Sequence, residues 1–183
     1  SGKGQGRNVW ESEDGKNLLF SIALDMSFLK AENQFILTQI VSVTMINVLK
    51  NYLPEESLSI KWPNDIYFND KKIAGILIKN EIKGMMMGTS IIGIGLNVNQ
   101  TSFYENLPNP ISMKMITGKD FDLDELLSAI SCQLSAVSNY VNRQQTTDNR
   151  PCITFNFQFS TFNSQYTSYL YRYEQWAFYE HEG

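Results

Sequence analysis

The chain has 183 residues, of which 43% are hydrophobic and 19% charged, and its formal net charge is −4. This is the composition of a globular protein with a substantial core. Because there is no excess of basic residues, we expect no nucleic-acid partner. The apolar runs are too short to span a bilayer, so we expect no membrane partner.

The cysteines and the histidine restrict the chemistry. Cys132 and Cys152 are the only cysteines and form no CxxC pair, which predicts free thiols in a reducing compartment and a cytoplasmic location. His181 is the single histidine. A Ser-His-Asp triad, a Cys-His pair and a His-rich zinc site therefore have no internal histidine. Catalysis has to use lysine, arginine, carboxylates, backbone donors or a bound metal.

The first half of the chain reads as strands around one long helix. Leu18–Asp25 is typical of a buried strand, and Asn33 is a candidate N-cap for a helix that runs to about Tyr52. Four further segments have strand character, with turn signals at residues 69–70 and 83–84: Leu58–Trp62, Ile66–Phe68, Lys72–Ile78 and Met85–Val98. We expect the last of these to be a central strand.

The second half contains one clear helix. Asn106–Pro110 reads as a loop, and Asp122 with Glu125 forms a capping-box pattern ahead of an apolar repeat from Leu126 to Val137. Residues 144–150 are polar, and the tyrosine-rich stretch Tyr166–Trp176 predicts one more short helix. Strands in hairpins, with helices between the groups, predict an α+β fold with a mixed, largely antiparallel sheet and helices packed on it. A doubly wound parallel sheet is disfavoured.

Four segments carry the chemistry. The glycine-rich basic loop Gly2–Trp10 allows backbone N–H groups to approach a ligand. In Lys61–Asp65 a lysine stands in an apolar run beside short polar side chains, where it can attract a carboxylate or a phosphate. Lys72–Leu77 and Gly93–Asn99 are strand-like segments whose glycines admit close approach.

Each segment also has a purely structural interpretation. An isolated Lys61 would be read as a strand end with a snorkelling lysine, but the ordered set of segments disfavours that reading. Gly75 can serve only close strand packing, and Gly93 and Gly95 can only relieve a crowded sheet. Gly-Ile-Gly does not indicate a dinucleotide site, because no helix start follows at the expected spacing.

Taken together, Gly-Lys-Gly-Gln-Gly-Arg-Asn-Val-Trp, Lys-Trp-Pro-Asn-Asp, Lys-Ile-Ala-Gly-Ile-Leu and Gly-Ile-Gly-Leu-Asn-Val-Asn resemble the catalytic domain of biotin protein ligases. The likeness runs from Gly2 to about Asn99 and continues more weakly to Tyr140; Leu170–Trp176 resembles the end of that domain. The resemblance implies a class II synthetase-like biotinyl/lipoyl ligase fold and one catalytic domain over residues 1–183. Against the family pattern, we expect this chain to lack an upstream biotin-contacting segment and the small C-terminal domain.

The resemblance also implies a reaction and its participants. Biotin's carboxylate attacks the α-phosphate of ATP, which gives biotinyl-5′-AMP and pyrophosphate. A lysine amine of a biotin carboxyl carrier protein then attacks the mixed anhydride. Biotin, ATP and Mg²⁺ are implied, and a homodimer is left open. Such a step needs positive charge and fixed donors and no covalent nucleophile.

The resemblance further assigns candidate residues. Lys61 is the catalytic candidate, in contact with the biotin carboxylate and the phosphoryl oxygens. The biotin-binding candidates are Lys3, Gly4, Gln5, Lys61 and Gly75, and the ATP or adenylate candidates are Arg7, Trp10, Asn64, Asp65 and Asn97. No metal ligand is assigned. Asp65 can equally cap a turn, and Trp10 can stack on adenine or pack over the ordered loop, which we favour.

Gln5 departs from the arginine that is common at this position of the family. We therefore expect Lys3 and Arg7 to supply the charge that holds the adenylate. Two other functions remain open: a lipoate or octanoate ligase or transferase, and a non-catalytic module that binds biotin or an adenylate. The Lys-Trp-Pro-Asn-Asp segment and the glycine-rich loop favour biotin.

Overall fold

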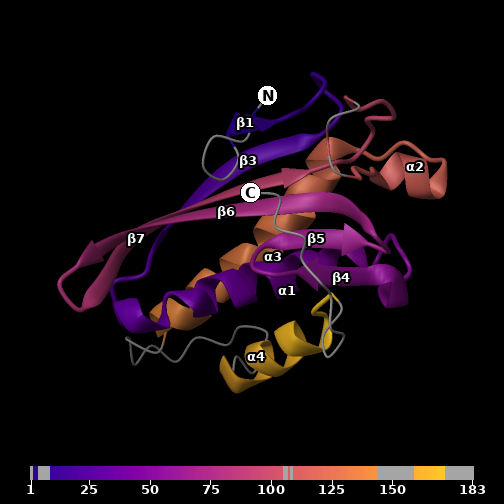
Figure 1. The fold of residues 1–183 in the computed structure, drawn as a ribbon. Coiled ribbons are helices and arrows are strands. Elements are labelled where there is room, and N and C mark those ends of the chain that lie inside the picture. The colour runs from indigo at the N-terminus through magenta and orange to yellow at the C-terminus, as the bar shows by residue number, and fades with distance from the viewer. Residues whose placement is uncertain (1, 4–8, 105–106, 108, 144–158, 172–183) are drawn as a thin grey trace, which may run out of the picture.

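The computed structural model describes residues 2–3, 9–104, 107, 109–143 and 159–171. Its main sheet is antiparallel, with strands in the order β3 (Leu18–Asp25), β7 (Met86–Leu96), β6 (Lys71–Lys83), β5 (Asp65–Phe68) and β4 (Leu58–Lys61). A short hairpin of β1 (Gly2–Lys3) and β2 (Val9–Trp10) lies beside β3 (Figure 1). Helices pack against the main sheet, so the predicted α+β fold is confirmed.

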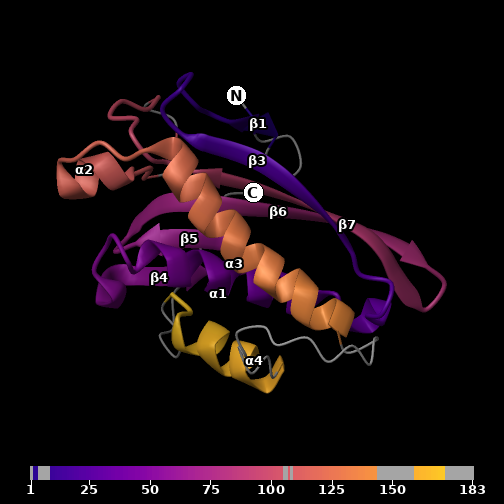
Figure 2. The ribbon, with the colours of Figure 1, turned by 180° about the vertical axis from the view of Figure 1, so that it is seen from behind.

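The two faces of the main sheet differ. Ile76, Ile92 and Ile94 point into the core and are at most 3% exposed. Gly75 and Gly95 alternate with them on the opposite face, because successive residues of a strand point to opposite sides. Figure 2 shows α3 (Leu123–Arg143) crossing the helix-covered face. We term the opposite face, which carries the two glycines, the open face.

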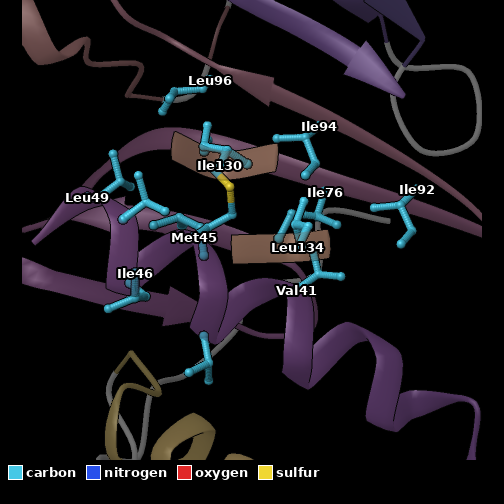
Figure 3. Packing of buried hydrophobic residues seen from close by; sticks show 14 of the residues in the cluster. Val41, Met45, Ile46, Leu49, Ile76, Ile92, Ile94, Leu96, Ile130 and Leu134 are labelled. Carbon is cyan, nitrogen blue, oxygen red and sulfur yellow. The ribbon is translucent and has the colours of Figure 1, made fainter. Parts of the chain in front are cut away.

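The core lies between the sheet and helices α1 (Phe35–Leu49) and α3. Figure 3 labels the side chains that meet there, Val41, Met45, Ile46, Leu49, Ile76, Ile92, Ile94, Leu96, Ile130 and Leu134. Burial of one such side chain contributes about 1.5–3 kcal/mol to folding. This core fixes the sheet whose open face carries the sequence motifs.

The observed α1 corrects two details of the predicted helix. Asn33 lies in a 3₁₀ turn, η1 (Ala31–Asn33), and Gln34 takes the N-cap position, so the prediction of Asn33 as the cap is wrong. The backbone N–H of Asn33 donates to the carbonyl of Lys30 in that turn. The helix also ends at Leu49 rather than near Tyr52. More than one face of it is buried, because the sheet, α3 and α4 all contact it.

The predicted strands are present with shifted ends. β4 ends at Lys61 because residues 62–64 form the turn into β5. β6 continues past Ile78 to Lys83, since its polar second half stays paired with β7 up to the Lys83–Met86 pair. β7 lies between β3 and β6, which confirms the expected interior strand.

Two helix ends are fixed by capping groups. The Asp122 carboxylate accepts hydrogen bonds from the backbone N–H groups of Asp124 and Glu125, as expected for a cap of α3. The short helix α2 (Met113–Thr117) was not predicted, although Ser112 caps it and Gly118 closes it with a φ of 73°. Another short turn, η2 (Glu55–Ser57), precedes β4. None of the helices in the described part of the chain is long and apolar enough to cross a membrane.

The C-terminal helix lies earlier in the sequence than predicted. α4 spans Phe159–Ser168, whereas the predicted helix was Tyr166–Trp176. The chain leaves the helix because Leu170 pairs in parallel with Ile60, at the outer edge of β4. Residues 172–176 of the predicted helix, the polar stretch 144–150 and part of the predicted loop at 106–110 lie outside the described residues.

Candidate active site

Three of the sequence motifs meet in one row across the sheet. Lys61 of β4 pairs with Asp65 of β5, Asp65 pairs with Gly75 of β6, and Gly75 pairs with Gly95 of β7. Leu19 of β3 completes the row opposite Gly95. Directly paired residues point to the same face of a sheet, so this row lies on the open face. A cationic side chain therefore stands at one end of a floor that has no side chains at Gly75 and Gly95.

The indole of Trp10 rests on this glycine floor. A Cβ atom added at Gly95 would lie 2.6 Å from Cε2 of Trp10, and one added at Gly75 would lie 2.8 Å from Cζ3. Only glycine allows so close an approach at these two positions. The glycines are thus explained by the indole above them and not by crowding within the sheet, since a Cβ at Gly93 would meet its nearest atoms at 3.6 Å.

Lys61 is positioned by the neighbouring strand. Its Nζ donates a hydrogen bond to the Tyr67 hydroxyl at 3.3 Å and lies 5.2 Å from the centre of the Tyr67 ring. Tyr67 lies two residues beyond Asp65, the direct partner of Lys61, and is 7% exposed. The sequence reasoning did not select Tyr67, because nothing in the sequence shows this diagonal contact between strands.

Asp65 pairs with a second lysine that the sequence reasoning did not select. Lys72 Nζ lies 2.8 Å from Asp65 Oδ2, and the same ammonium lies 5.4 Å from the centre of the Trp10 ring. Both side chains of the ion pair are only 27–28% exposed. The signal was present, because Lys72 opens the Lys-Ile-Ala-Gly-Ile-Leu motif. The pair places a second ammonium beside the glycine floor, with its charge balanced by the Asp65 carboxylate.

Asn64 and Asn97 hold the ends of the site through the backbone. The Asn64 side chain donates to the Ile76 carbonyl, and the Ile76 N–H donates back to the Asn64 carbonyl at 3.0 Å. Asn97 is 3% exposed, and its Nδ2 donates to the Ile111 carbonyl at 3.1 Å. These bonds tie the turn after Lys61 to β6 and the end of β7 to the segment before α2.

Two polar atoms near the glycine floor have no hydrogen-bond partner among the described residues. They are Oδ1 of Asn97 and Nε1 of Trp10, and both are buried. A buried polar group that stays unpaired costs about 1–3 kcal/mol. One acceptor and one donor are therefore present at the end of the site where β7 meets the Trp10 hairpin.

The remaining predicted residues are Lys3, at the end of β1, and three residues that lie between β1 and β2 in sequence. Gly4, Gln5 and Arg7 lie outside the described residues, and for Lys3 only the backbone, paired with Val9, is described. Among the described residues, no three His, Cys, Asp or Glu side chains gather closely enough to hold a metal ion. The carboxylate within the motifs, that of Asp65, forms an ion pair with Lys72.

Comparisons with known proteins place the chain in a family. The sequence profile of the Biotin/lipoate A/B protein ligase family matches residues 1–97. The chain is 31% identical over 129 residues to the bifunctional ligase/repressor BirA of Bacillus spizizenii, covering 67% of this chain and 38% of that protein. It is 37% identical over 108 residues to the human biotin–protein ligase, covering 55% of this chain and 14% of that protein.

Solved structures show the same fold. The Aquifex aeolicus biotin protein ligase in complex with biotin and ATP superposes with a TM-score of 0.68 at 27% identity, over 90% of this chain and 62% of that one. The Leishmania major biotin protein ligase in complex with biotin gives 0.72 at 21% identity, over the whole of this chain and 71% of that one, which shows the fold alone.

The antiparallel sheet with helices on one face is the fold that this chain shares with the Aquifex aeolicus biotin protein ligase. This chain belongs to the biotin/lipoate A/B protein ligase family. It spans well under half the length of the curated relatives from Bacillus spizizenii and human.

Proposed function

We propose that this chain is the catalytic part of a biotin protein ligase, with residues 1–183 forming one domain. One observation carries the proposal. The lysine of the Lys-Trp-Pro-Asn-Asp motif stands in register with Gly75 and Gly95, and the indole of Trp10 rests on these two glycines. That arrangement offers the flat apolar face of the indole to biotin's ring system and a cation to its carboxylate. The human relative, which is named a biotin–protein ligase, supports the same substrate.

The proposed reaction has two steps. A carboxylate oxygen of biotin attacks the α-phosphorus of ATP, the bond to the β-phosphate oxygen breaks, and pyrophosphate leaves. The amine of a carrier-protein lysine then attacks the carbonyl carbon of the anhydride, loses a proton and releases AMP. Lys61 serves the first step, because its charge counters the charge that develops on the phosphoryl oxygens. Lys72 contributes a second, more distant cation that Asp65 holds in place.

The other proposed contacts follow from the same site. Gly75 serves biotin binding by letting the Trp10 indole lie flat on the sheet, and Lys3 at the end of β1, with Gly4 and Gln5 after it, supplies further biotin contacts in this proposal. Arg7 and Trp10 face the adenylate, with Asn64, Asp65 and Asn97 at the ends of the site. The biotin carboxyl carrier protein is the proposed acceptor and the cytoplasm the proposed location, and a homodimer remains part of the hypothesis.

The described residues fit a magnesium ion only if ATP supplies most of its ligands. The described residues offer no cluster of three ligands, and the nearest carboxylate is already paired. Mg²⁺ is commonly bound through substrate phosphates and water with few protein ligands. When bound to ATP it would neutralise charge on the phosphates, and no step assigned to a residue of the chain depends on it.

Biotin-dependent exchange of labelled pyrophosphate into ATP tests the proposal. We expect exchange with biotin and none with lipoate or octanoate, and we expect Lys61→Ala to lower the rate by about two to three orders of magnitude. Lys30→Ala is the matched control, because Lys30 is exposed and paired only with a neighbouring surface glutamate among the described residues. Exchange with lipoate alone would favour the lipoate function, and biotin binding without exchange would favour a non-catalytic module.

A further inference from the structure

The segment after α4 forms an additional edge beside the strand that carries Lys61. The Ile60 N–H donates to the Tyr169 carbonyl at 2.6 Å, and the Tyr171 N–H donates to the Ile60 carbonyl at 2.7 Å. Leu170 pairs in parallel with Ile60 and packs against the core. Since neighbouring residues alternate in direction, Tyr171 lies beside Lys61 on the open face.

Two tyrosine rings meet next to the Lys61 side chain. The rings of Tyr67 and Tyr171 have their centres 5.4 Å apart and are inclined by 43°. They come from either side of β4, and the β4 residue directly opposite Tyr67 is Ser59, whose short side chain leaves space for this contact. Tyr67 in turn accepts the hydrogen bond of Lys61 and lies under its ammonium. Tyr171, Tyr67 and Lys61 therefore form a continuous series of contacts.

The same segment is fastened to both ends of β4 through its hydroxyls. Tyr166 donates to the Pro63 carbonyl at 2.8 Å, just after Lys61. Tyr169 donates to Glu55 in the turn before β4, and Tyr171 donates to Asp70 in the turn after β5. Hydrogen bonds to carboxylates are stronger than those between neutral groups. The bond to Asp70 fixes the Tyr171 side chain itself, and Tyr171 in turn limits the positions that the Tyr67 ring can take.

We propose that Tyr67 is a positioning residue for the Lys61 ammonium and that Tyr171 holds the Tyr67 ring in place. The inference rests on the proposed adenylation by Lys61 and adds to it the residues that aim the lysine. A lysine side chain loses rotamer entropy when it is fixed. The ring and hydroxyl of Tyr67 fix it before substrate binds, and an ammonium has three N–H donors, so this bond is compatible with bonds to an anionic substrate.

The variants separate the hydroxyl from the ring. Tyr67→Phe removes the hydrogen bond and keeps the ring, so we expect kcat for pyrophosphate exchange to fall about three- to tenfold. Tyr171→Leu removes the supporting ring, and we expect a loss of the same order. The KM for biotin should change less than about twofold in both, because the lost contact acts on the transition state. Tyr169→Phe is the matched control: it removes a tyrosine hydroxyl from the same segment, bonded to Glu55, and should leave kcat unchanged.

A double-mutant cycle tests whether Tyr67 acts through Lys61. In a Lys61→Ala background, Tyr67→Phe should have no further effect on the exchange rate, since the group that it positions is gone. Equal fold losses in both backgrounds would overturn the proposal, because they would assign Tyr67 to packing alone. This outcome would leave the proposed ligase function intact.

A second measurement does not depend on activity. Reductive methylation of lysine amines, followed by mass spectrometry, reports how freely the Lys61 amine reacts relative to Lys30 in the same sample. We expect Tyr67→Phe and Tyr171→Leu to raise the Lys61 reactivity severalfold and Tyr169→Phe to leave it unchanged. Unchanged reactivity in all variants would overturn the positioning contact. A raised reactivity in a chain without biotin-dependent exchange would support the contact and refute the proposed function.

Discussion

Gly95 lies directly opposite Gly75 on the neighbouring strand, and the Trp10 indole rests on both. A methyl group at Gly95 would stand 2.6 Å from the indole ring, so the hairpin that carries Trp10 would have to move. The Trp10 side chain can therefore take this position only because Gly75 and Gly95 have no Cβ atoms. The same relationship distinguishes Gly95 from Gly93, the other glycine of β7 on the open face, where no ring lies above the backbone.

Gly95→Ala should displace Trp10, whereas Gly93→Ala should not. Overpacking of this kind costs about 1–3 kcal/mol, and a displaced indole should raise the KM for biotin. At Gly93 the nearest atoms would lie at 3.6 Å from a new Cβ, an ordinary contact. Tryptophan fluorescence and biotin titration measure both effects. A variant at Gly95 with parental fluorescence and affinity would show that Trp10 does not cover the biotin floor.

Breaking the Lys72–Asp65 ion pair should cost as much as breaking the strongest exposed ion pairs. Its side chains are only 27–28% exposed and its Nζ–Oδ2 distance is 2.8 Å. Exposed pairs contribute about 0.2–1 kcal/mol, so we expect Asp65→Asn and Lys72→Met each to lower the free energy of unfolding by about 1 kcal/mol. Urea denaturation of the two single variants and the double variant measures the coupling. Strict additivity would mean that the two groups do not stabilise each other.

Asn97→Asp should weaken the end of β7. The change keeps the side-chain shape but replaces the donor that faces the Ile111 carbonyl with a second acceptor. The buried carbonyl then lacks its partner, at a cost of about 1–3 kcal/mol. Thermal denaturation with and without biotin and ATP gives the loss and shows whether ligand binding is affected. An unchanged melting temperature would indicate that the segment before α2 is held by other contacts.

Alkaline pH should destabilise the fold through the C-terminal tyrosines. Burial raises the pKa of Tyr166 to about 12, and burial together with the bond to Glu55 raises the pKa of Tyr169 to about 12, from the ordinary value of 10.0. A raised phenol pKa contributes stability below pH 10 that is lost as the pH rises through the folded pKa. Urea denaturation should therefore give a constant midpoint up to about pH 10 and a falling one above it. The fall should be less steep in Tyr166→Phe, and equal slopes would contradict this assignment.

Arg7→Ala should speed the release of biotinyl-AMP more than Gln5→Ala does. The prediction comes from the sequence alone, because both residues lie outside the described part of the chain. A charge-assisted hydrogen bond to phosphate is roughly twice as strong as a neutral one. Dissociation rates of the adenylate from the two variants decide the order. Faster release from the Gln5 variant would reverse the roles.

Local signals predicted much of the fold. Leu18–Asp25 is a strand with the predicted bounds, and Asp122 caps α3, because apolar runs and capping side chains act within a few residues. The Asn33 cap failed because a 3₁₀ turn took that position. The helix predicted from Tyr166 ended at Ser168 because the edge of β4 offered backbone partners that lie more than a hundred residues earlier in sequence.

The candidate site was only partly predictable for the same reason. The motifs indicated which segments carry it, but their register is a property of the sheet, where an irregularity between Ile66 and Tyr67 shifts the β5–β6 pairing. The contacts of Lys61 with Tyr67 and of Lys72 with Asp65 follow from that register. No pattern in the sequence predicts this register.

The pairing of β3 with β7 has a consequence for how the chain folds during synthesis. Local hairpins connect the successive strands β4, β5, β6 and β7. Leu18 of β3, in contrast, can pair only after Leu96 of β7 has been synthesised. Contacts between residues far apart in sequence form late, because the intervening chain must be closed into a loop first. β3 therefore leaves the ribosome long before its partner and joins the sheet after the hairpins of β4 to β7 have formed, carrying the Trp10 hairpin into place over glycines that are already paired.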